Sequence, residues 1–590
     1  STVINYTYDP LYRLTTTTYP SGTINYAYDA VGNRLAMTDT IGVSTYHYDD
    51  LDRLLQVTGP NGKLNYSYDA NSNRTNLTYP NGKVVTSTYD LANRLLTVSD
   101  WNGRVTTYSY DAANRQTGIL YPNNIQATYT YDNADQMLNI LHTSPVSGSI
   151  AVFTYTLDAV GNRLSMTDLD GATSYTYDDL YRLTQVTYPD NETVIYAYDP
   201  IGNRTVMTST ISGVITYTYD ADDRLLTAGS TTFTWDANGN MTDKGNAIFT
   251  FDGLDRLTQV VSGTTTVQFT YDGDGVRLRK VVNGTVTTYT QDIVVPLPMV
   301  LVETITGQTN RYIYGNDLLA QIDPANILAF YHNDGLGSTR VLSNLAGQRT
   351  DTYNYNAFGA ARSFTGNIGQ PFTFAGEQTD DELGLIFLRA RYFDPQIGRF
   401  ISSDFFPGFS MDTQSINSYI YTQNNPVNYA DPNGEFIITA LAIGVIAYAG
   451  YETYQAWDDL LYNSFDEDVG LQSKLALHYS GDFENPEWQQ NEETLPQDIH
   501  TTLGSASYAA VTPPGTSITG PPPTSLSWTG PVGFILNQLL PGFKKPTPNR
   551  IQRRSYYPQY SNYNGFGYYT GGSYGSNGGG SWGGPPSGGK

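Results

Sequence analysis

Short runs of alternating residues dominate the first 290 residues of the chain. In Thr173–Tyr177 (TSYTY), aromatic rings alternate with small polar side chains, so the rings share one face of an extended segment. An Asp and a short turn follow. A second run begins with Arg-Leu, as at Arg53-Leu54, and ends at a Pro-x-Gly turn such as Tyr79–Gly82 (YPNG). Each unit therefore predicts a β-hairpin with two strands of roughly 20 Å each.

The hairpin unit is repeated in tandem. Most steps are 20 or 21 residues, as from Asp29 to Asp49 and from Asp69 to Asp90. An internal period of this length is typical of a solenoid or a spiral. The fourteen copies are marked by an aromatic or Leu residue followed by Asp9, Asp29, Asp49, Asp69, Asp90, Asp111, Asp132, Asp158, Asp178, Asp199, Asp220, Asp236, Asp252 and Asp272.

The gap between this Asp and the following Arg has two lengths. It is short from Asp49 to Arg53 and one residue longer from Asp29 to Arg34, where Gly-Asn is inserted. Two turn types joining the same pair of strands explain such a difference. We expect the Asp to cap the turn and the Arg to pair with a carboxylate on an adjoining repeat. Because the pair recurs along the array, these residues are interpreted as scaffold and not as catalysts.

Three β architectures compete for this pattern. A propeller needs about 40–45 residues per blade, which is too long for one repeat. Two repeats per blade do not fit either, because some steps are irregular, such as that from Asp220 to Asp236. A three-sided β-helix has coils of suitable length but does not need a hairpin turn in each coil. A spiral of hairpins fits best.

Composition agrees with an all-β fold and narrows the function. The 590 residues include 50 Tyr and 56 Gly, which favour strands and turns. A net charge of −24 argues against nucleic acid binding on the outer surface, which needs a basic face. The absence of Cys excludes disulfides, thiolate metal sites and cysteine nucleophiles.

No cofactor or metal site is predicted. His332 is interpreted as a hydrogen-bonded strand residue, and the other histidines share no motif spacing with it.

Beyond the repeats, five motifs occur in an order that resembles the Rhs-repeat-associated core. This family includes bacterial Rhs proteins, the C subunits of Tc toxins and the YD shell of teneurins. With the repeats, the resemblance covers residues 1–434 and implies a hollow β shell closed by a plug. The motifs are Phe330–Arg340 (FYHNDGLGSTR), Tyr353–Gly359 (YNYNAFG), Phe374–Glu377 (FAGE), Leu388–Phe400 (LRARYFDPQIGRF) and Asn424–Gly434 (NNPVNYADPNG).

The resemblance also implies a candidate catalytic pair. In self-cleaving relatives, two aspartates cut the chain just past the second DP-x-G motif; the matching residues here are Asp404 and Asp431. Two close carboxyl groups share a proton, so that one acts as an acid while the other activates water. The expected bond is Glu435-Phe436. Two departures from the family leave a purely structural plug as the alternative, since Pro407 is displaced from Asp404 and Glu435 replaces an apolar residue.

Composition divides the chain into five expected regions. They are the YD-repeat shell (1–290), the Rhs core and plug (291–434), a variable region (435–511), a Pro/Gly linker with a basic patch (512–554), and a Tyr/Gly-rich tail (555–590). The apolar run Phe436–Gly450 is shorter than the roughly twenty residues of a membrane span. It predicts a buried or amphipathic helix, with membrane delivery left open.

Three functions remain open. The first is a shell that encloses or presents its own C-terminal segment as cargo for delivery to another cell. The second is a structural extracellular or cell-surface filament, self-associating through the Tyr/Gly tail. The third is a carbohydrate-binding adhesin. An extracellular or cell-surface location follows from the resemblance alone. Because Ser1–Pro10 already reads as the end of a repeat, we expect a mature product or a fragment of a longer chain.

Overall fold

One long antiparallel sheet makes up most of the molecule. The computed structural model describes residues 3–406, 408, 413–435 and 438–439. Thirty-six strands, from β1 (Asn5–Tyr8) to β36 (Ala361–Thr365), pair in chain order, each with the next. The predicted all-β spiral of hairpins is confirmed.

Each hairpin buries one face and exposes the other. In the hairpin of β5 (Val43–Tyr48) and β6 (Leu54–Gly59), Tyr46 lies opposite Val57, and both side chains are buried. Threonine pairs such as Thr88 and Thr97 lie on the exposed face. The register shifts by one residue between His47 and Tyr48, and the same shift recurs in the other hairpins that carry the repeat. Because a β-bulge bends its strand and increases twist, a bulge in every repeat curls the sheet.

The two turn lengths place arginine side chains on opposite faces of the wall. In the short turn, Arg53 Nε donates to Asp49 Oδ2 at 2.7 Å. In the long turn, Asn33 Nδ2 takes that place on Asp29 Oδ2 at 3.0 Å, and Arg34 moves to the next strand position. That position is a core position, because Leu54 occupies it in the short repeat and is buried.

The expectation that each Arg pairs with a carboxylate on an adjoining repeat is therefore wrong for most short turns, although Arg115 does pair with Asp135 of the next repeat at 2.8 Å. Arg53 pairs with Asp49 of its own turn, and only its Nη1 reaches onward, to the Asp69 carbonyl oxygen at 2.9 Å. Long-turn arginines do reach other parts of the chain: Arg34 pairs with Asp274 at 2.5 Å. The predicted capping role of the Asp is confirmed, since Asp29 Oδ1 accepts from the backbone N–H groups of Val31, Gly32 and Asn33.

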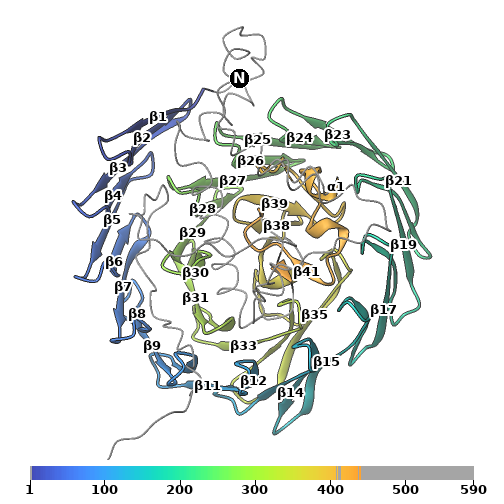
Figure 1. The fold of residues 1–590 in the computed structure, drawn as a ribbon, viewed down its shortest axis with the longest axis horizontal. Coiled ribbons are helices and arrows are strands. Elements are labelled where there is room, and N and C mark those ends of the chain that lie inside the picture. The colour runs from blue at the N-terminus through green and yellow to red at the C-terminus, as the bar shows by residue number, and fades with distance from the viewer. Residues whose placement is uncertain (1–2, 407, 409–412, 436–437, 440–590) are drawn as a thin grey trace, which may run out of the picture.

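The sheet winds nearly twice around a common centre. In Figure 1 the strands from β1 to β23 (Thr231–Trp235) form an outer ring, and those from β27 (Thr265–Tyr271) to β33 (Leu328–Asn333) lie inside it. We call β1–β23 the first winding and β27–β36 the second winding. Contacts between them span 240 residues at Arg34 and Asp274 but only 170 at Glu192 and Arg362, so the spiral tightens as it proceeds.

The core lies between the windings. Buried rings of the first winding, such as Tyr66 and Tyr121, share one cluster with Leu301, Phe330 and Val341 of the second winding. The first Tyr of the repeat is typically buried, as at Tyr46 and Tyr108. These rings are therefore part of the wall, whereas the carbohydrate-binding alternative requires rings on the outer surface.

The plug is a separate small unit inside the ring. Its four-stranded sheet comprises β37 (Gln378–Asp380), β38 (Leu385–Leu388), β39 (Arg391–Asp394) and β40 (Arg399–Phe400). It is preceded by the short 3-10 helix η1 (Phe374–Gly376) and followed by α1 (Thr413–Ile416), η2 (Thr422–Asn424), β41 (Tyr429–Ala430) and β42 (Ile438–Thr439). Figure 1 shows this region, drawn in gold and orange, within the windings. The predicted closure of the shell by a plug is confirmed.

Several predictions fall beyond these elements. The helix expected over Phe436–Gly450, the linker and the Tyr/Gly tail lie outside the described residues. Within the part that is described, no helix is long and apolar enough to cross a membrane. The expected boundary at residues 290/291 falls inside β29 (Thr285–Asp292), and the division into domains stays a prediction.

Candidate functional site at the exit of the plug

Long-range ion pairs hold the plug against both windings. Asp380 is fully buried and accepts from Arg277 Nη1 at 2.5 Å and from Lys280 Nζ at 2.9 Å, both on β28 (Arg277–Val282). Asp394, also fully buried, pairs with Lys244 at 2.5 Å. On the first winding, Arg399 Nη1 donates to Asn203 Oδ1 at 3.0 Å. A buried charge is costly unless it is paired, so these contacts fix where the plug sits.

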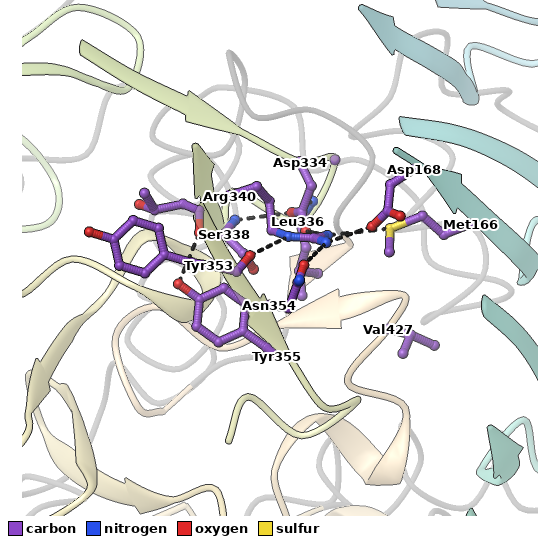
Figure 2. Close-up of polar contacts among 12 residues, drawn as sticks. Met166, Asp168, Asp334, Leu336, Ser338, Arg340, Tyr353, Asn354, Tyr355 and Val427 are labelled. Carbon is purple, nitrogen blue, oxygen red and sulfur yellow. Dashed lines mark hydrogen bonds and ion pairs between the residues drawn. The ribbon is translucent and has the colours of Figure 1, made fainter. Parts of the chain in front are cut away.

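The motif Phe330–Arg340 supplies a further clamp between the windings, shown in Figure 2. Arg340 Nη2 donates to Asp168 Oδ2 of the first winding and to Asn354 Oδ1 of the second, both at 2.7 Å. Its Nε donates to the Tyr353 carbonyl oxygen at 2.9 Å, and Nη1 lies 3.3 Å from Asp334 Oδ2. One guanidinium thus joins three strands and a turn. This motif of the Rhs core is structural.

The two predicted catalytic aspartates meet at one arginine. Arg391 Nη2 lies 2.7 Å from Asp404 Oδ2 and 3.6 Å from Asp431 Oδ2. The guanidinium carbon lies 3.6 Å from the centre of the Phe400 ring, and Nη1 donates to the Ser418 carbonyl oxygen at 3.0 Å. All three charged side chains are largely buried. The structure therefore brings Asp404 and Asp431 together, 27 positions apart in the sequence (431 − 404).

Arg391 and burial shift the pKa of Asp404 in opposite directions. Burial raises the pKa of Asp404, and the Arg391 charge lowers it; the net shift of this pKa is upward. A carboxyl group with a raised pKa holds its proton at a higher pH than an exposed Asp. Such a group is suited to the acid role in a carboxyl pair.

Hydrogen bonds from side chains hold both the N–H groups and the carbonyl oxygens of the backbone around Gly434–Glu435. Asp431 Oδ1 accepts from Gly434 N at 2.9 Å and from Glu435 N at 3.1 Å. Arg391 Nε donates to the Gly434 carbonyl oxygen, and Arg389 Nη1 donates to that of Pro432. Gly434 has a φ of +75°, and a Cβ there would lie 2.6 Å from the Leu388 carbonyl oxygen. Glycine is required because the chain passes the β38–β39 turn so closely.

Glu435 adds a third carboxyl group to the site. Burial raises the pKa of Glu435 to about 7, Asp404 and Asp431 push the pKa the same way, and Arg391 opposes them. Near neutral pH the Glu435 side chain therefore changes between its neutral and charged forms. The apolar residue that the related family carries at this position does not ionise.

The predicted bond Glu435-Phe436 stays a prediction, because Phe436 lies outside the described residues. What the structure adds are Arg389 and Arg391, which sequence reasoning did not single out. Both lie in the recognised motif Leu388–Phe400, at alternate positions. The available signal was Arg391 in a strand that is buried on both faces, with Arg389 in the turn just before it. Within the described chain, no group of three or more His, Asp or Glu side chains is placed to hold a metal ion.

Known families match most of this architecture. The teneurin YD-shell model matches residues 157–427. The RHS repeat model matches four overlapping stretches, 28–64, 48–84, 68–105 and 89–126. The chain is a Rhs/YD-repeat protein. Together the two models match residues 28–126 and 157–427, which include most of the two windings and the plug as far as the start of the last recognised motif.

Similar proteins include bacterial toxins. This Rhs/YD-repeat chain is 30% identical over 308 residues to the tRNA3(Ser)-specific nuclease WapA of Bacillus spizizenii, covering 51% of this chain and 12% of that protein. It is 35% identical over 136 residues to toxin protein Tse5 of Pseudomonas aeruginosa, covering 22% of this chain and 10% of that protein. The chain thus spans about an eighth of WapA.

A solved structure shares the fold. A Tc holotoxin pore of Photorhabdus luminescens that carries a TccC3 variant matches with a TM-score of 0.53 and 16% identity. The match covers 73% of this chain and 29% of that one. At this identity the likeness supports the shell fold alone.

Proposed function

We propose that this protein is a shell that encloses its own C-terminal segment, residues 436–590, and severs it from the plug by aspartyl self-cleavage. The proposal rests on the contacts that hold the chain where it leaves the plug. Asp431 and Arg391 hold the two sides of the Gly434–Glu435 peptide, and Asp404 lies against the same guanidinium. A structural plug needs an anchored chain, but it does not need three carboxyl groups around that anchor.

The position of this exit favours enclosure over presentation on the outside. The plug lies within the windings in Figure 1, and its contacts reach both of them, through Arg399 to Asn203 and through Asp380 to Arg277. A segment that starts at Glu435 therefore starts inside the ring. The proposal includes delivery of this segment to another cell, which the toxin names of the relatives support.

The chemistry uses the aspartates in two roles. The carboxylate of Asp431, already turned toward the backbone of residues 434 and 435, accepts a proton from water as the water oxygen attacks the scissile carbonyl carbon. Asp404, whose pKa is raised, donates its proton to the leaving amine. Arg391 holds both carboxyl groups and, through the Gly434 carbonyl oxygen, positions the peptide that directly precedes the scissile bond. One water is consumed and one peptide bond is broken.

Intact mass spectrometry of the purified protein tests the cleavage. The wild-type chain should give two masses that sum to the full chain plus one water, with the break at Glu435-Phe436. The Asp431→Asn variant should give one mass. Asp50→Asn, at an exposed position outside the plug, is the matched control and should be cut like the wild type. One uncut mass for the wild type overturns self-cleavage.

Enclosure is tested separately, by gel filtration of the cut protein. An enclosed segment stays with the shell, so both pieces should elute together at the volume of the uncut Asp431→Asn variant. Elution of residues 436–590 as a separate species without denaturant would contradict enclosure while leaving self-cleavage intact.

A further inference from the structure

Two buried histidines meet across the two windings. His142 lies on β14 (Met137–Ser144) of the first winding, and His332 lies on β33 of the second. Their Nδ1 atoms are 3.1 Å apart, and the ring centres are 4.8 Å apart. Only 1% of the His142 side chain and none of the His332 side chain is exposed. The contact joins positions 190 residues apart, so it belongs to the junction between windings and not to one hairpin.

Further hydrogen bonds extend this contact. Asn123 Nδ2 donates to Ser343 Oγ at 3.0 Å, and Ser343 Oγ lies 2.7 Å from His332 Nε2. When both imidazoles are neutral, one Nδ1 carries the hydrogen and donates it to the other, and the tautomers decide which. The chain of bonds runs from the first winding to the second and back to the first.

A proton on each ring breaks this contact, because two N–H groups then face each other at 3.1 Å. A single added proton places a charge on two side chains that are almost fully buried, which is costly.

The surroundings offer the added charge little compensation. The Tyr121 ring lies 4.9 Å from the His332 ring, and its hydroxyl donates to the Tyr331 carbonyl oxygen. Phe330 packs against the same Tyr121 ring. A hydrogen bond to the backbone of Asn333 favours a charged His142. The charge of Asp317 raises the pKa of the neighbouring Tyr121. Burial outweighs these effects: it lowers the pKa of His142 to about 4 and holds the pKa of His332 well below its ordinary value.

We propose that His142 and His332 form an acid-sensitive latch, which holds the second winding to the first at neutral pH and releases it in mildly acidic surroundings. The proposal does not depend on self-cleavage or on the nature of the enclosed segment. It concerns the strength of the wall where β14 and β33 meet.

The sign of the effect follows from linkage. In the unfolded chain each His takes up a proton below about pH 6.5, whereas the folded state resists it. The stabilisation is complete above about pH 6.5 and is lost as the pH falls toward 4. Elsewhere the junction uses Arg-carboxylate pairs, such as Arg34 with Asp274.

Hydrogen exchange measured at pH 7.5 and pH 5.0, corrected for intrinsic rates, tests the latch. In the wild type, protection of β14 and β33 should fall roughly tenfold or more at pH 5.0, as expected for a group whose pKa differs by more than one unit between closed and open states. The double variant His142→Asn/His332→Asn keeps an amide pair that does not titrate there, and its protection should not fall. His47→Asn, at an exposed strand position, is the matched control and should behave as wild type.

Two results would overturn the latch: equal protection of wild-type β14 and β33 at both pH values, or an equal loss in the double variant. If the double variant does not fold, an NMR titration of the wild type labelled with ¹³C-histidine decides. Two imidazole signals that titrate below about pH 5, or that shift only as the fold opens, support the proposal. All imidazoles titrating near pH 6.5 contradict it.

Discussion

The wall and the plug both rely on contacts between Arg and Asp, but these contacts span very different distances along the sequence. In the wall, Arg53 binds Asp49 four residues away and the Asp69 carbonyl sixteen residues away. In the plug, Asp380 binds Arg277 across 103 residues. Along the sheet, each repeat of the wall contacts its neighbours through similar local turns, and long-range pairs such as Arg34 with Asp274 are added where the windings meet. The plug has no repeat, and its position depends on distant charges that must all be satisfied at once.

This difference predicts different consequences of damage. A broken contact in the wall should loosen the neighbouring hairpins, because the rest of the spiral keeps its own contacts. A broken contact in the plug should loosen both windings, because the plug joins them. Four substitutions, from the largest expected effect to the smallest, test this contrast.

Asp380→Ala should have the largest effect. It leaves Arg277 and Lys280 without their shared carboxylate, and the Arg277 side chain is fully buried. Removing one partner of a buried pair costs about 3–5 kcal/mol of unfolding free energy. Chemical denaturation measures the loss, and hydrogen exchange should rise in both windings and in the plug. A loss below about 1 kcal/mol would show that this pair does not anchor the plug.

Leu183→Ala should cost about 3 kcal/mol, because the side chain is fully buried in a cluster of wall and plug residues and its removal leaves a cavity. Exchange should rise most in β18 (Leu183–Thr187) and in the strands paired with it, β17 (Gly171–Tyr177) and β19 (Thr193–Tyr198). An equal rise throughout both windings would remove the distinction between local wall and long-range plug.

Glu435→Gln should stabilise the protein by about 2 kcal/mol at pH 8 and by much less at pH 5. The raised pKa of Glu435, about 7, means that the folded state favours the neutral carboxyl. Stability is therefore lost as the pH rises from about 4.3 through 7, and Gln, which does not ionise, avoids this loss. Denaturation of both proteins at the two pH values measures it. A pH-independent difference would mean that the Glu435 carboxyl is not buried near Asp404.

Asp49→Ala should cost about 1 kcal/mol. It removes the acceptor for the N–H groups of Leu51 and Arg53 in a half-exposed turn, where water replaces part of what is lost. Asp179→Ala, at an exposed position next to the equivalent turn Asp, is the control and should change stability by less than about 0.5 kcal/mol. A cost as large as that of Asp380→Ala would contradict the local character of the wall.

The wall was predictable from sequence because its determinants are close together. The alternation of rings, the Asp caps and the two turn lengths all lie within single repeats. Even so, the meaning of the longer turn was missed: Asn33 replaces an Arg on the capping Asp, which turns Arg34 into the core. The pattern could have been found by aligning repeats on the Asp, since Arg then falls where Leu54 does.

The plug was predictable only in part. The resemblance selected Asp404 and Asp431, and the structure places both on Arg391. Nothing in the sequence pairs His332 with His142 or Asp380 with Arg277, because the period fades where the second winding begins. Which residues of two windings meet depends on the curvature of the whole sheet, and curvature accumulates from many small bulges.

Trypsin digestion of the intact protein tests enclosure of residues 436–590 most directly. That segment contains Lys474, Arg550 and Arg553, which are trypsin sites. Inside the shell these sites should survive digestion under native conditions. They should be cut rapidly in the Asp380→Ala variant or after partial denaturation. Rapid cleavage at Lys474 and Arg553 in the wild type, with both windings still folded, would contradict enclosure.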